Sequence, residues 1–221
     1  MHSGIAVIVV NYNTADLLRA CLEHVLASSL DRPLQVYVVD NGSSDGSVAM
    51  LQEEFPCVHV IEAGANLGFA RANNLALAEI LARVPGDADR DHCYVLLLNS
   101  DCFVQPDTLQ ITARFLDCHP DAGVVGARLQ LRDGTLDLAC RRAFPTPAGA
   151  FWKLAGLARR FPANPRFAQY NLTFLDPDKI SEVDAVSGAY MLVRLSAIDE
   201  AGPLDEAFFM YGEDLDWAYR I

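Results

Sequence analysis

The first 120 residues alternate between short apolar runs and longer segments in which apolar residues recur every three or four positions. The short runs are Ile5–Val10, Leu34–Val39, Val58–Ile61 and Tyr94–Leu98. Nearly continuous apolar runs of this length are typical of strands buried on both faces of a parallel sheet. The segments between them have the spacing of amphipathic helices, as Leu18, Leu22 and Val25 show after the first run. Four successive strand–helix units predict an α/β, doubly wound sheet with right-handed crossovers.

The pattern changes in the second half of the chain. Segments 124–131 and 135–138 flank Arg132-Asp133-Gly134 and are predicted to pair as a hairpin. Residues 141–180 are rich in Pro, Arg and aromatic residues without a stable period, so we expect a long functional loop or a flap there. Residues 183–194 are predicted to form a last core strand. In the first half, residues 85–91 are an expected polar surface loop.

Composition excludes several classes of protein. The 221 residues include 17 basic and 29 acidic side chains, a net charge of −12, which argues against a nucleic-acid binder that neutralises phosphates. An apolar content of 52% excludes a disordered chain, and no apolar run approaches the ~20 residues that a membrane helix needs. The six cysteines have no CxxC spacing, so we expect a reduced, cytoplasmic protein.

The charge is unevenly distributed along the chain. Residues 1–137 carry 18 acids and 8 bases, residues 138–175 carry no acid and six bases, and residues 176–221 carry 11 acids and 3 bases. The basic segment 138–175 has two interpretations. It binds an anionic lipid diphosphate or a membrane surface, or it is a solvated loop whose arginines pair with the acidic flanks.

Asp and Asn side chains gather just after the predicted strands, where ligands bind in open α/β sheets. The residues at these positions are Asn11, Asn13, Asp40, Asn66, Gly68, Arg71, Asn73, Asn99 and Asp101. The sequence has no GxGxxG motif after the first strand and no Walker A motif, which disfavours Rossmann cofactors and P-loop nucleotides. Asp101 follows an apolar run and is placed to hold a divalent cation through oxygen ligands. Because Pro106-Asp107 already begins the next helix, capping does not account for Asp101.

A second acidic group lies near residue 214. Glu213, Asp214 and Asp216 place three carboxylates within four residues, directly after an apolar run at 208–210. These carboxylates repel one another unless a cation, a substrate proton or a helix N-terminus offsets the repulsion. An acidic first helical turn explains Asp214 and Asp216, but it does not explain the preceding apolar run. Glu213 and Asp214 are therefore candidate functional residues.

Six motifs, in this order and spacing, resemble those of family 2 glycosyltransferases, which have the glycosyltransferase A fold. The motifs are IAVIVVNYN, VVDNGSSDGS, NLGFARANN, VLLLNSD, VSGAYMLV and FFMYGEDLDW. Within the family, the chain most resembles the bacterial rhamnosyltransferase-like branch, which builds surface polysaccharides. The resemblance implies a mostly parallel central sheet in one catalytic domain over residues 1–221. A nucleotide-sugar half would occupy about residues 1–120 and an acceptor half about 121–221.

The resemblance also implies roles in donor binding. Asp40 would accept a hydrogen bond from the imide N–H of uracil or thymine, and the chain around Asn11 and Asn13 would line the base and ribose. Asn66, Gly68 and Arg71 would approach the ribose and diphosphate, while Asn73 and Asn99 would shape the same pocket. Asp101 would bind Mg²⁺ or Mn²⁺ at the diphosphate. The family's metal motif often has Asp where this chain has Asn99, so the metal would depend mainly on Asp101.

The chemistry implied by the resemblance is a single in-line displacement that inverts the anomeric configuration. Asp214 would take the proton of the acceptor hydroxyl, with Glu213 beside it. The donor would be a UDP- or dTDP-sugar, with dTDP-rhamnose suggested by the branch, and the acceptor a saccharide or a lipid-linked saccharide. The protein would work in the cytoplasm, at the inner face of the membrane, with a peripheral contact through residues 138–175.

Two other functions remain alternatives at this point. A non-catalytic nucleotide-sugar-binding or scaffold domain would keep the fold without turnover. A sugar-phosphate nucleotidyltransferase is disfavoured, because it needs a glycine-rich phosphate loop where this chain has Asn11-Tyr12-Asn13-Thr14. The helix that opens at Asp214 has no C-cap before Ile221, so we expect a chain truncated at its C-terminus.

Overall fold

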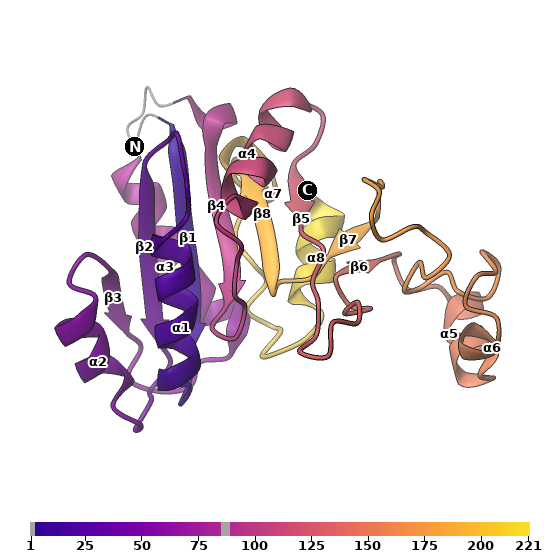
Figure 1. Cartoon of the computed structure of the whole chain (residues 1–221), viewed down its shortest axis with the longest axis horizontal. Coiled ribbons are helices and arrows are strands. Elements are labelled where there is room, and N and C mark those ends of the chain that lie inside the picture. Colours follow the sequence, from indigo (N-terminus) through magenta and orange to yellow (C-terminus); the bar gives the residue numbers. More distant parts are fainter. Residues whose placement is uncertain (1–2, 85–88) are drawn as a thin grey trace.

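The computed structural model describes residues 3–84 and 89–221. A six-stranded sheet in the order β3-β2-β1-β4-β8-β5 forms its centre (Figure 1). The strands of this sheet are β1 (Gly4–Asn11), β2 (Leu34–Asp40), β3 (His59–Glu62), β4 (Cys93–Asn99), β5 (Val124–Gly126) and β8 (Tyr190–Arg194). Strands β1 to β4 pair in parallel, while β8 runs antiparallel to both β4 and β5. The predicted doubly wound, mostly parallel sheet is confirmed.

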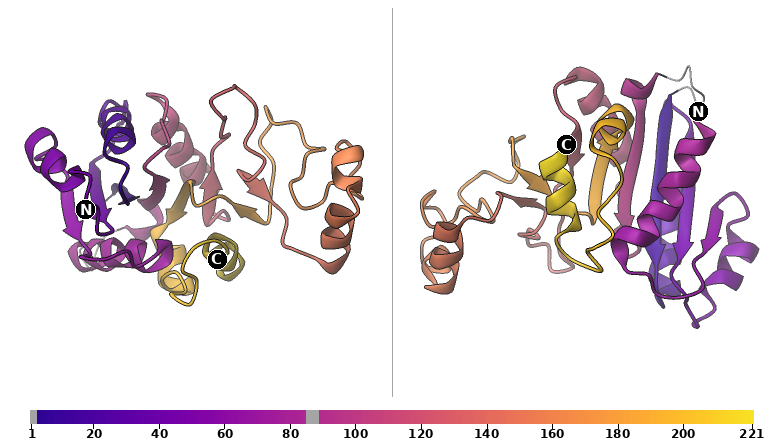
Figure 2. Two further views of the ribbon diagram at one scale, coloured as in Figure 1. Left: turned by 90° about the horizontal axis from the view of Figure 1, so that it is seen from below. Right: turned by 180° about the vertical axis from the view of Figure 1, so that it is seen from behind.

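Helices cover both faces of the sheet (Figure 2). They are α1 (Ala15–Leu26), α2 (Ser47–Glu54), α3 (Phe69–Arg83), α4 (Thr108–Cys118), α7 (Leu195–Ala201) and α8 (Glu213–Arg220), with a short 3₁₀ turn over Arg90–His92. Helices α1, α2 and α4 pack on the face that carries Ile5, Val7 and Val9, and α3, α7 and α8 pack on the opposite face. Burying each Val or Ile side chain of β1 contributes about 1.5–3 kcal/mol, which explains why this run forms the central strand.

The register of the parallel strands aligns the predicted polar residues at one edge of the sheet. Asn11 lies opposite Asp40, and Val10 lies opposite Asn99. The carboxyl ends of β1, β2 and β4 therefore meet at the same edge, which we call the carboxyl edge.

The second half of the chain differs from the expectations in part. The predicted hairpin at 132–134 forms but is short: Gln130 bridges Leu136, and the backbone N–H groups of Leu131 and Asp137 donate to the carbonyls of Thr135 and Leu129. Residues 124–126 do not belong to it, because they join the central sheet as β5. The predicted strand over 183–194 is two strands in different sheets, β7 (Ala185–Val186) and β8. Helix α7, which follows β8 directly, was not predicted. Residues 85–88 of the expected polar loop lie outside the described residues.

The expected flap over 141–180 contains regular structure. It begins with β6 (Arg141–Arg142), which pairs with β7 in a separate two-stranded sheet, and continues through α5 (Pro147–Leu154) and α6 (Leu157–Arg160). All three views show α5 and α6 at the far end of this excursion, away from the central sheet (Figures 1 and 2). We call residues 143–184 the arm.

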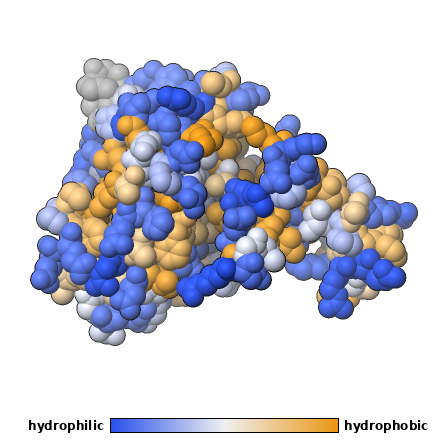
Figure 3. All heavy atoms as spheres, in the orientation of Figure 1, coloured by the Kyte–Doolittle hydropathy of each residue, from blue (hydrophilic) through white to orange (hydrophobic). Residues whose placement is uncertain are grey.

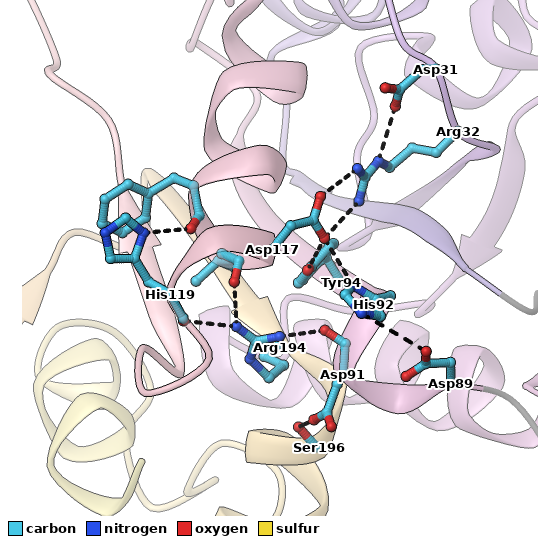
Figure 4. Close-up of polar contacts among 12 residues, drawn as sticks. Asp31, Arg32, Asp89, Asp91, His92, Tyr94, Asp117, His119, Arg194 and Ser196 are labelled. Carbon is cyan, nitrogen blue, oxygen red and sulfur yellow. Dashed lines mark hydrogen bonds and ion pairs between the residues drawn. The ribbon is translucent and has the colours of Figure 1, made fainter.

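A network of charged side chains ties helix α4 to the opposite, amino edge of the sheet (Figure 4). Asp117 accepts hydrogen bonds from Arg32 Nη2 at 2.6 Å and from the Tyr94 hydroxyl at 2.7 Å, and His92 Nδ1 lies 3.0 Å away. Burial alone would raise the pKa of Asp117, but these hydrogen bonds outweigh it and hold the pKa well below its usual range. The ionised carboxylate therefore stabilises the folded state at neutral pH, and this contribution is lost as the pH falls through the lowered pKa.

Candidate functional site at the carboxyl edge

Asp40 and Asn11 form the floor of the carboxyl edge. The Asn11 amide donates to Asp40 Oδ1 at 3.0 Å and to the Ser43 hydroxyl at 3.0 Å, and the Ser43 backbone N–H donates to Asp40 Oδ2 at 2.9 Å. Both Asn11 and Asp40 are buried. Because the Asn11 amide nitrogen already has two acceptors, this side chain positions Asp40 and the loop that follows β2.

The loops after β1, β2 and β4 are joined to one another by short polar side chains. The Asn13 side-chain oxygen accepts from the Ser44 backbone N–H at 2.8 Å, and Asn13 has a left-handed φ of 55°. The Thr14 hydroxyl lies 2.9 Å from that of Ser100, after β4. Asn13 is exposed, so its outer side is open to a ligand above the edge.

Asn41 is a site residue that the sequence reasoning missed. Its buried side chain donates to Asn66 Oδ1 at 3.0 Å and accepts from the Leu67 backbone N–H at 2.9 Å. These bonds lock the loop after β3 against the loop after β2. The run of Asn, Gly and Ser after Asp40 is typical of a turn whose side chains hydrogen-bond to the backbone. It could have predicted that Asn41 orders this turn.

At Gly68, the loop after β3 lies very close to the segment that precedes Glu213 and Asp214. Its φ and ψ of 81° and −177° fall in a region that only glycine adopts readily. A Cβ at this position would lie 2.3 Å from the carbonyl oxygen of Phe209, and the next N–H, that of Phe69, donates to the same oxygen at 2.8 Å. The apolar run before Glu213 therefore packs the acidic motif onto the start of α3.

Asp214 reaches the carboxyl edge through Gly188. The Gly188 backbone N–H donates to Asp214 Oδ2 at 3.1 Å, and the carbonyl oxygen of the next residue, Ala189, accepts from the Asn99 N–H at 3.1 Å. A Cβ on Gly188 would be 3.2 Å from the Phe69 ring, so this contact also depends on a small residue. The predicted strand end at Asn99 and the predicted carboxylate Asp214 are thus separated by a single short segment.

Arg142, at the root of the arm, holds the Asp214 carboxylate. Its Nη2 donates to Asp214 Oδ2 at 2.5 Å and to the Val186 carbonyl at 3.1 Å, and the two side chains are only 11% and 12% exposed. The Leu215 backbone N–H donates to the other Asp214 oxygen, Oδ1, at 2.8 Å. The sequence reasoning assigned no such role to Arg142.

Glu213 is buried beside the Arg142–Asp214 ion pair, and it forms no ion pair with any described residue. Its Oε2 has no hydrogen-bond partner among the described residues, although the residue is only 5% exposed. Burial raises the pKa of the Glu213 carboxyl above its usual range, and the neighbouring Asp214 adds to the rise, while a backbone N–H and Arg142 oppose it. A buried carboxyl in this state is a candidate ligand contact.

Arg71 and Asn73 do not join the predicted cluster through their side chains. Arg71 is 59% exposed and lies 3.9 Å from Glu206. Asn73 is buried and donates to the Phe69 carbonyl one turn earlier in α3 at 2.9 Å, so it stabilises the start of that helix.

Asp101 is exposed after β4 and makes no ion pair with any described residue. Among the described residues, no group of three or more His, Cys, Asp or Glu side chains is placed to hold a metal. Burial raises the pKa of the neighbouring Cys102 thiol to about 12, and Asp101 adds to this, so the thiol is protonated at neutral pH. The site therefore offers the Asp101 carboxylate and no thiolate. This fits Mg²⁺ or Mn²⁺, which bind through one or two protein carboxylates when substrate phosphates supply the other ligands.

A groove of about 460 Å³ lies between the root of the arm and α5. Its lining includes Phe144, Pro145, Leu172 and Phe174, with Lys153 and Asp184 as charged members. The Phe144 ring also contacts the ring of Tyr219 on α8, with centroids 5.3 Å apart. One lining residue of the groove therefore contacts the C-terminal part of α8, the helix that carries Asp214 near its N-terminus.

Comparison with known proteins identifies this arrangement. The model of the family described as glycosyl transferase family 2 matches residues 6–185. The chain belongs to glycosyl transferase family 2. The family membership expected from the six motifs is confirmed, and the protein is a glycosyltransferase.

Relatives of this glycosyltransferase support the narrower branch. It is 30% identical, over its whole length and 71% of the relative, to the N-acetylglucosaminyl-diphospho-decaprenol L-rhamnosyltransferase of Mycobacterium tuberculosis (strain ATCC 25618 / H37Rv). It is 25% identical to Rhamnosyltransferase WbbL of Escherichia coli (strain K12), over 97% of this chain and 75% of the relative. The expected likeness to the bacterial rhamnosyltransferase-like branch is confirmed.

Solved structures confirm the glycosyltransferase A fold. The mannosyltransferase PcManGT from Pyrobaculum calidifontis, in complex with GDP-Man and Mn²⁺, superposes with a TM-score of 0.61 at 20% identity, over 97% of this chain and 50% of that one. S. aureus TarS 1–349 in complex with UDP gives 0.62 at 18% identity, over 97% and 54%. The chain spans about half the length of these two structures. No helix within residues 3–84 and 89–221 is long and apolar enough to cross a membrane.

Proposed function

We propose that this glycosyltransferase moves a sugar from a UDP- or dTDP-sugar, dTDP-rhamnose in particular, to a hydroxyl of a saccharide or lipid-linked saccharide during cell-surface polysaccharide synthesis. The observation that carries the proposal is the link from Asn99 through Ala189 and Gly188 to Asp214, because it sets a carboxylate beside the donor edge. The acceptor part of the proposal is supported by a relative whose name includes a diphospho-decaprenol acceptor.

The donor nucleotide lies along the carboxyl edge in this proposal. Asp40 accepts the imide N–H of the base, and the chain at Asn11 and Asn13 lines the base and ribose. Asn66 and Gly68 face the ribose and diphosphate, and Asn99 shapes the pocket. The exposed Arg71 would leave Glu206 to reach the diphosphate, and the buried Asn73 would shape the pocket only by holding the first turn of α3. Because Asp40 already accepts two hydrogen bonds, it has lone pairs left for one further donor.

Asp214 is the general base of the proposed reaction. The acceptor oxygen bonds to the anomeric carbon as the bond from that carbon to the diphosphate oxygen breaks, so the configuration inverts. The hydroxyl proton passes to Asp214 Oδ1, and the nucleoside diphosphate leaves. The unpartnered Oε2 of Glu213 accepts a hydrogen bond from the bound acceptor.

A divalent cation, Mg²⁺ or Mn²⁺, is held by Asp101 together with the donor diphosphate in this proposal. When bound, it neutralises the charge that develops on the leaving diphosphate. Asn99 stands where the family often has a second carboxylate, so Asp101 is the main protein ligand.

The acceptor occupies the second half of the chain, about residues 121–221, and its lipid part follows the apolar groove at Phe144. The donor half is about residues 1–120, and both halves form one catalytic domain. The protein works at the cytoplasmic face of a membrane, with a peripheral contact in the segment 138–175.

A nucleotide panel tests the donor assignment. We expect UDP or dTDP to raise the Tm of the chain and ADP not to, because adenine has no ring N–H to donate to Asp40. We expect no shift with GDP, because the larger guanine ring does not place its N1–H where the smaller uracil or thymine ring places its imide N–H. Mn²⁺ should increase the shift, and Asp101→Asn should remove this increase while Asp107→Asn, a nearby exposed carboxylate, should keep it. The absence of any metal-dependent shift would instead favour a non-catalytic nucleotide-sugar-binding domain.

A further inference from the structure

The far end of the arm combines uncompensated positive charge with exposed apolar side chains. We call residues 147–167, which include α5 and α6, the arm tip. Lys153, Arg159, Arg160 and Arg166 are all exposed there. The whole segment 138–175 has no acidic residue.

Apart from Arg142, the basic residues of this segment form no ion pair with the acidic flanks among the described residues, contrary to one of the two interpretations of the sequence. Of its six basic side chains, only Arg142 forms an ion pair with a carboxylate among the described residues. Lys153 lies over the ring of Tyr170, and Arg166 over the ring of Trp152. The arm tip therefore keeps its positive charge available for an anionic partner.

Apolar side chains stand in solvent on the same tip. Phe151 is 59% exposed, Leu154 is 89% exposed and Phe161 is 43% exposed. On α5, residues 151 and 154 are three positions apart and share one face, whereas Ala150 and Lys153 line the groove. Apolar and hydrophilic patches accordingly lie side by side at the end of the arm (Figure 3).

The tip is held in shape by its own aromatic cluster. The Trp152 ring contacts those of Phe151 and Phe167, with centroids 5.0 and 5.2 Å apart, and Phe161 contacts Phe167 at 5.7 Å. Because these contacts are made within the tip, the exposed side chains are presented without support from the central sheet.

We infer that the arm tip docks onto an anionic lipid surface. Phe151, Leu154 and Phe161 enter the headgroup region, while Arg159 and Arg160 contact lipid phosphates. Exposed Leu and Phe favour a lipid surface over a nucleic acid, whose phosphates would need only the cations. The inference rests on and extends the proposed function, because a lipid-linked acceptor is presented at a membrane, and residues of the tip (Gly149, Ala150 and Lys153) line the groove proposed for its lipid part.

Sedimentation with vesicles tests the docking. The full chain is mixed with vesicles of phosphatidylcholine alone or of equal parts phosphatidylcholine and phosphatidylglycerol. We expect binding to the anionic vesicles that weakens with added salt, and much weaker binding to the neutral ones. Arg159→Gln with Arg160→Gln should lower the partition coefficient on the order of 10-fold, and Phe151→Ser with Leu154→Ser should lower it by a similar factor.

The matched control removes the same charge from the body of the molecule. Arg83→Gln with Arg114→Gln replaces two arginines that are ion-paired with Glu79 and Asp31, and should leave vesicle binding unchanged. Retained circular dichroism shows that each variant is folded. Failure of the wild-type chain to bind anionic vesicles, or equal loss in the body control, overturns the inference and points to a protein partner for the tip or to none.

The activity readout separates this inference from the proposed function. Asp214→Asn should bind vesicles like the wild type, whatever its effect on transfer. The arm-tip variants should still transfer to a water-soluble saccharide acceptor. Vesicle binding by the arm-tip variants equal to that of the wild type, with normal transfer, would overturn the docking alone. Normal transfer by Asp214→Asn would overturn the catalytic assignment alone.

Discussion

Three hydrogen bonds to Asp214 leave one position on its carboxylate open. Oδ2 accepts from Arg142 and Gly188, and Oδ1 accepts from the Leu215 backbone N–H. A carboxylate has about four lone-pair positions, so the remaining one lies on Oδ1. An acceptor hydroxyl that approaches Oδ1 can therefore lose its proton without displacing a protein contact.

This geometry predicts a positioning role for Arg142. We expect Arg142→Met to lower kcat on the order of 10²-fold with little change in KM for the nucleotide sugar, because Asp214 loses the contact that fixes its orientation. Arg142→Lys should recover part of the loss, since it restores a cation near Oδ2. Steady-state kinetics on the folded variants, with a soluble acceptor, measures both constants.

Arg141 provides the control for this prediction. It is the adjacent residue of β6, and its guanidinium donates to the carbonyl oxygens of Leu175 and Asp176 in the arm, not to Asp214. Arg141→Met should keep kcat close to that of the wild type. Equal loss in Arg141→Met and Arg142→Met would mean that β6 matters only for holding the arm.

At the scale of elements, the turn into α3 is where the carboxyl edge contacts the segment that carries Glu213 and Asp214. Gly68 adopts a glycine-only conformation, and its α-carbon faces the Phe209 carbonyl. Any side chain here pushes the 208–212 loop, and with it Glu213 and Asp214, away from the donor edge.

Gly68→Ala should lower the free energy of unfolding by about 3 kcal/mol, because it combines backbone strain with a clash against backbone atoms. Gly64→Ala is the matched control. Gly64 has a similar φ of 74°, but a Cβ there would meet nothing within 4 Å, so we expect a cost of about 1 kcal/mol. Urea denaturation of both variants measures the difference, and equal costs would contradict the close approach at Phe209.

Elements with strong periodicity were predictable, and those without it were not. Strands β1, β2 and β4 are largely buried on both faces, so their sequences are continuous apolar runs whose bounds were predicted to within about two residues. The short edge strand β3 is half-buried, and its bounds were predicted equally well. Helices α5 and α6 are short and separated by Gly156 in a left-handed conformation, so neither is long enough to show a helical period. The break between β7 and β8 at residues 187–189 is set by the contacts of Gly188 with Phe69 and Asp214, which no local pattern encodes.

In the candidate site, too, contacts that follow from a local sequence pattern were predictable, and contacts between distant segments were not. Asn11 and Asp40 were predictable as neighbours because parallel strands end together at one edge. The pair Arg142 and Asp214, 72 residues apart, depends on how the arm returns to the sheet through β6 and β7. Arg71 and Asn73 follow the same strand end as Gly68, yet the helix turns their side chains toward Glu206 and Phe69.

At the scale of the whole molecule, the net charge of −12 is the sum over segments whose charges differ in sign. The acidic residues lie in segments 1–137 and 176–221, which build the sheet and its carboxyl edge, while segment 138–175 carries six bases and no acid. In the proposed function, a donor diphosphate at an edge with net negative surroundings would need backbone N–H groups of the loops and a divalent cation to offset repulsion. Segment 138–175, by contrast, has a net charge of +6, which is the basis of the proposed docking of the arm tip to anionic lipid.

The most direct test of the account is transfer by Asp214→Asn. The measurement is turnover of a UDP- or dTDP-sugar onto a saccharide acceptor, together with nucleotide affinity, with Asp216→Asn as the control because Asp216 pairs with Arg220 on the same helix. We predict that Asp214→Asn loses turnover by 10²–10⁴-fold, on the order expected for a missing general base, while it binds nucleotide like the wild type. Turnover by Asp214→Asn equal to that of Asp216→Asn would contradict the assignment of the base.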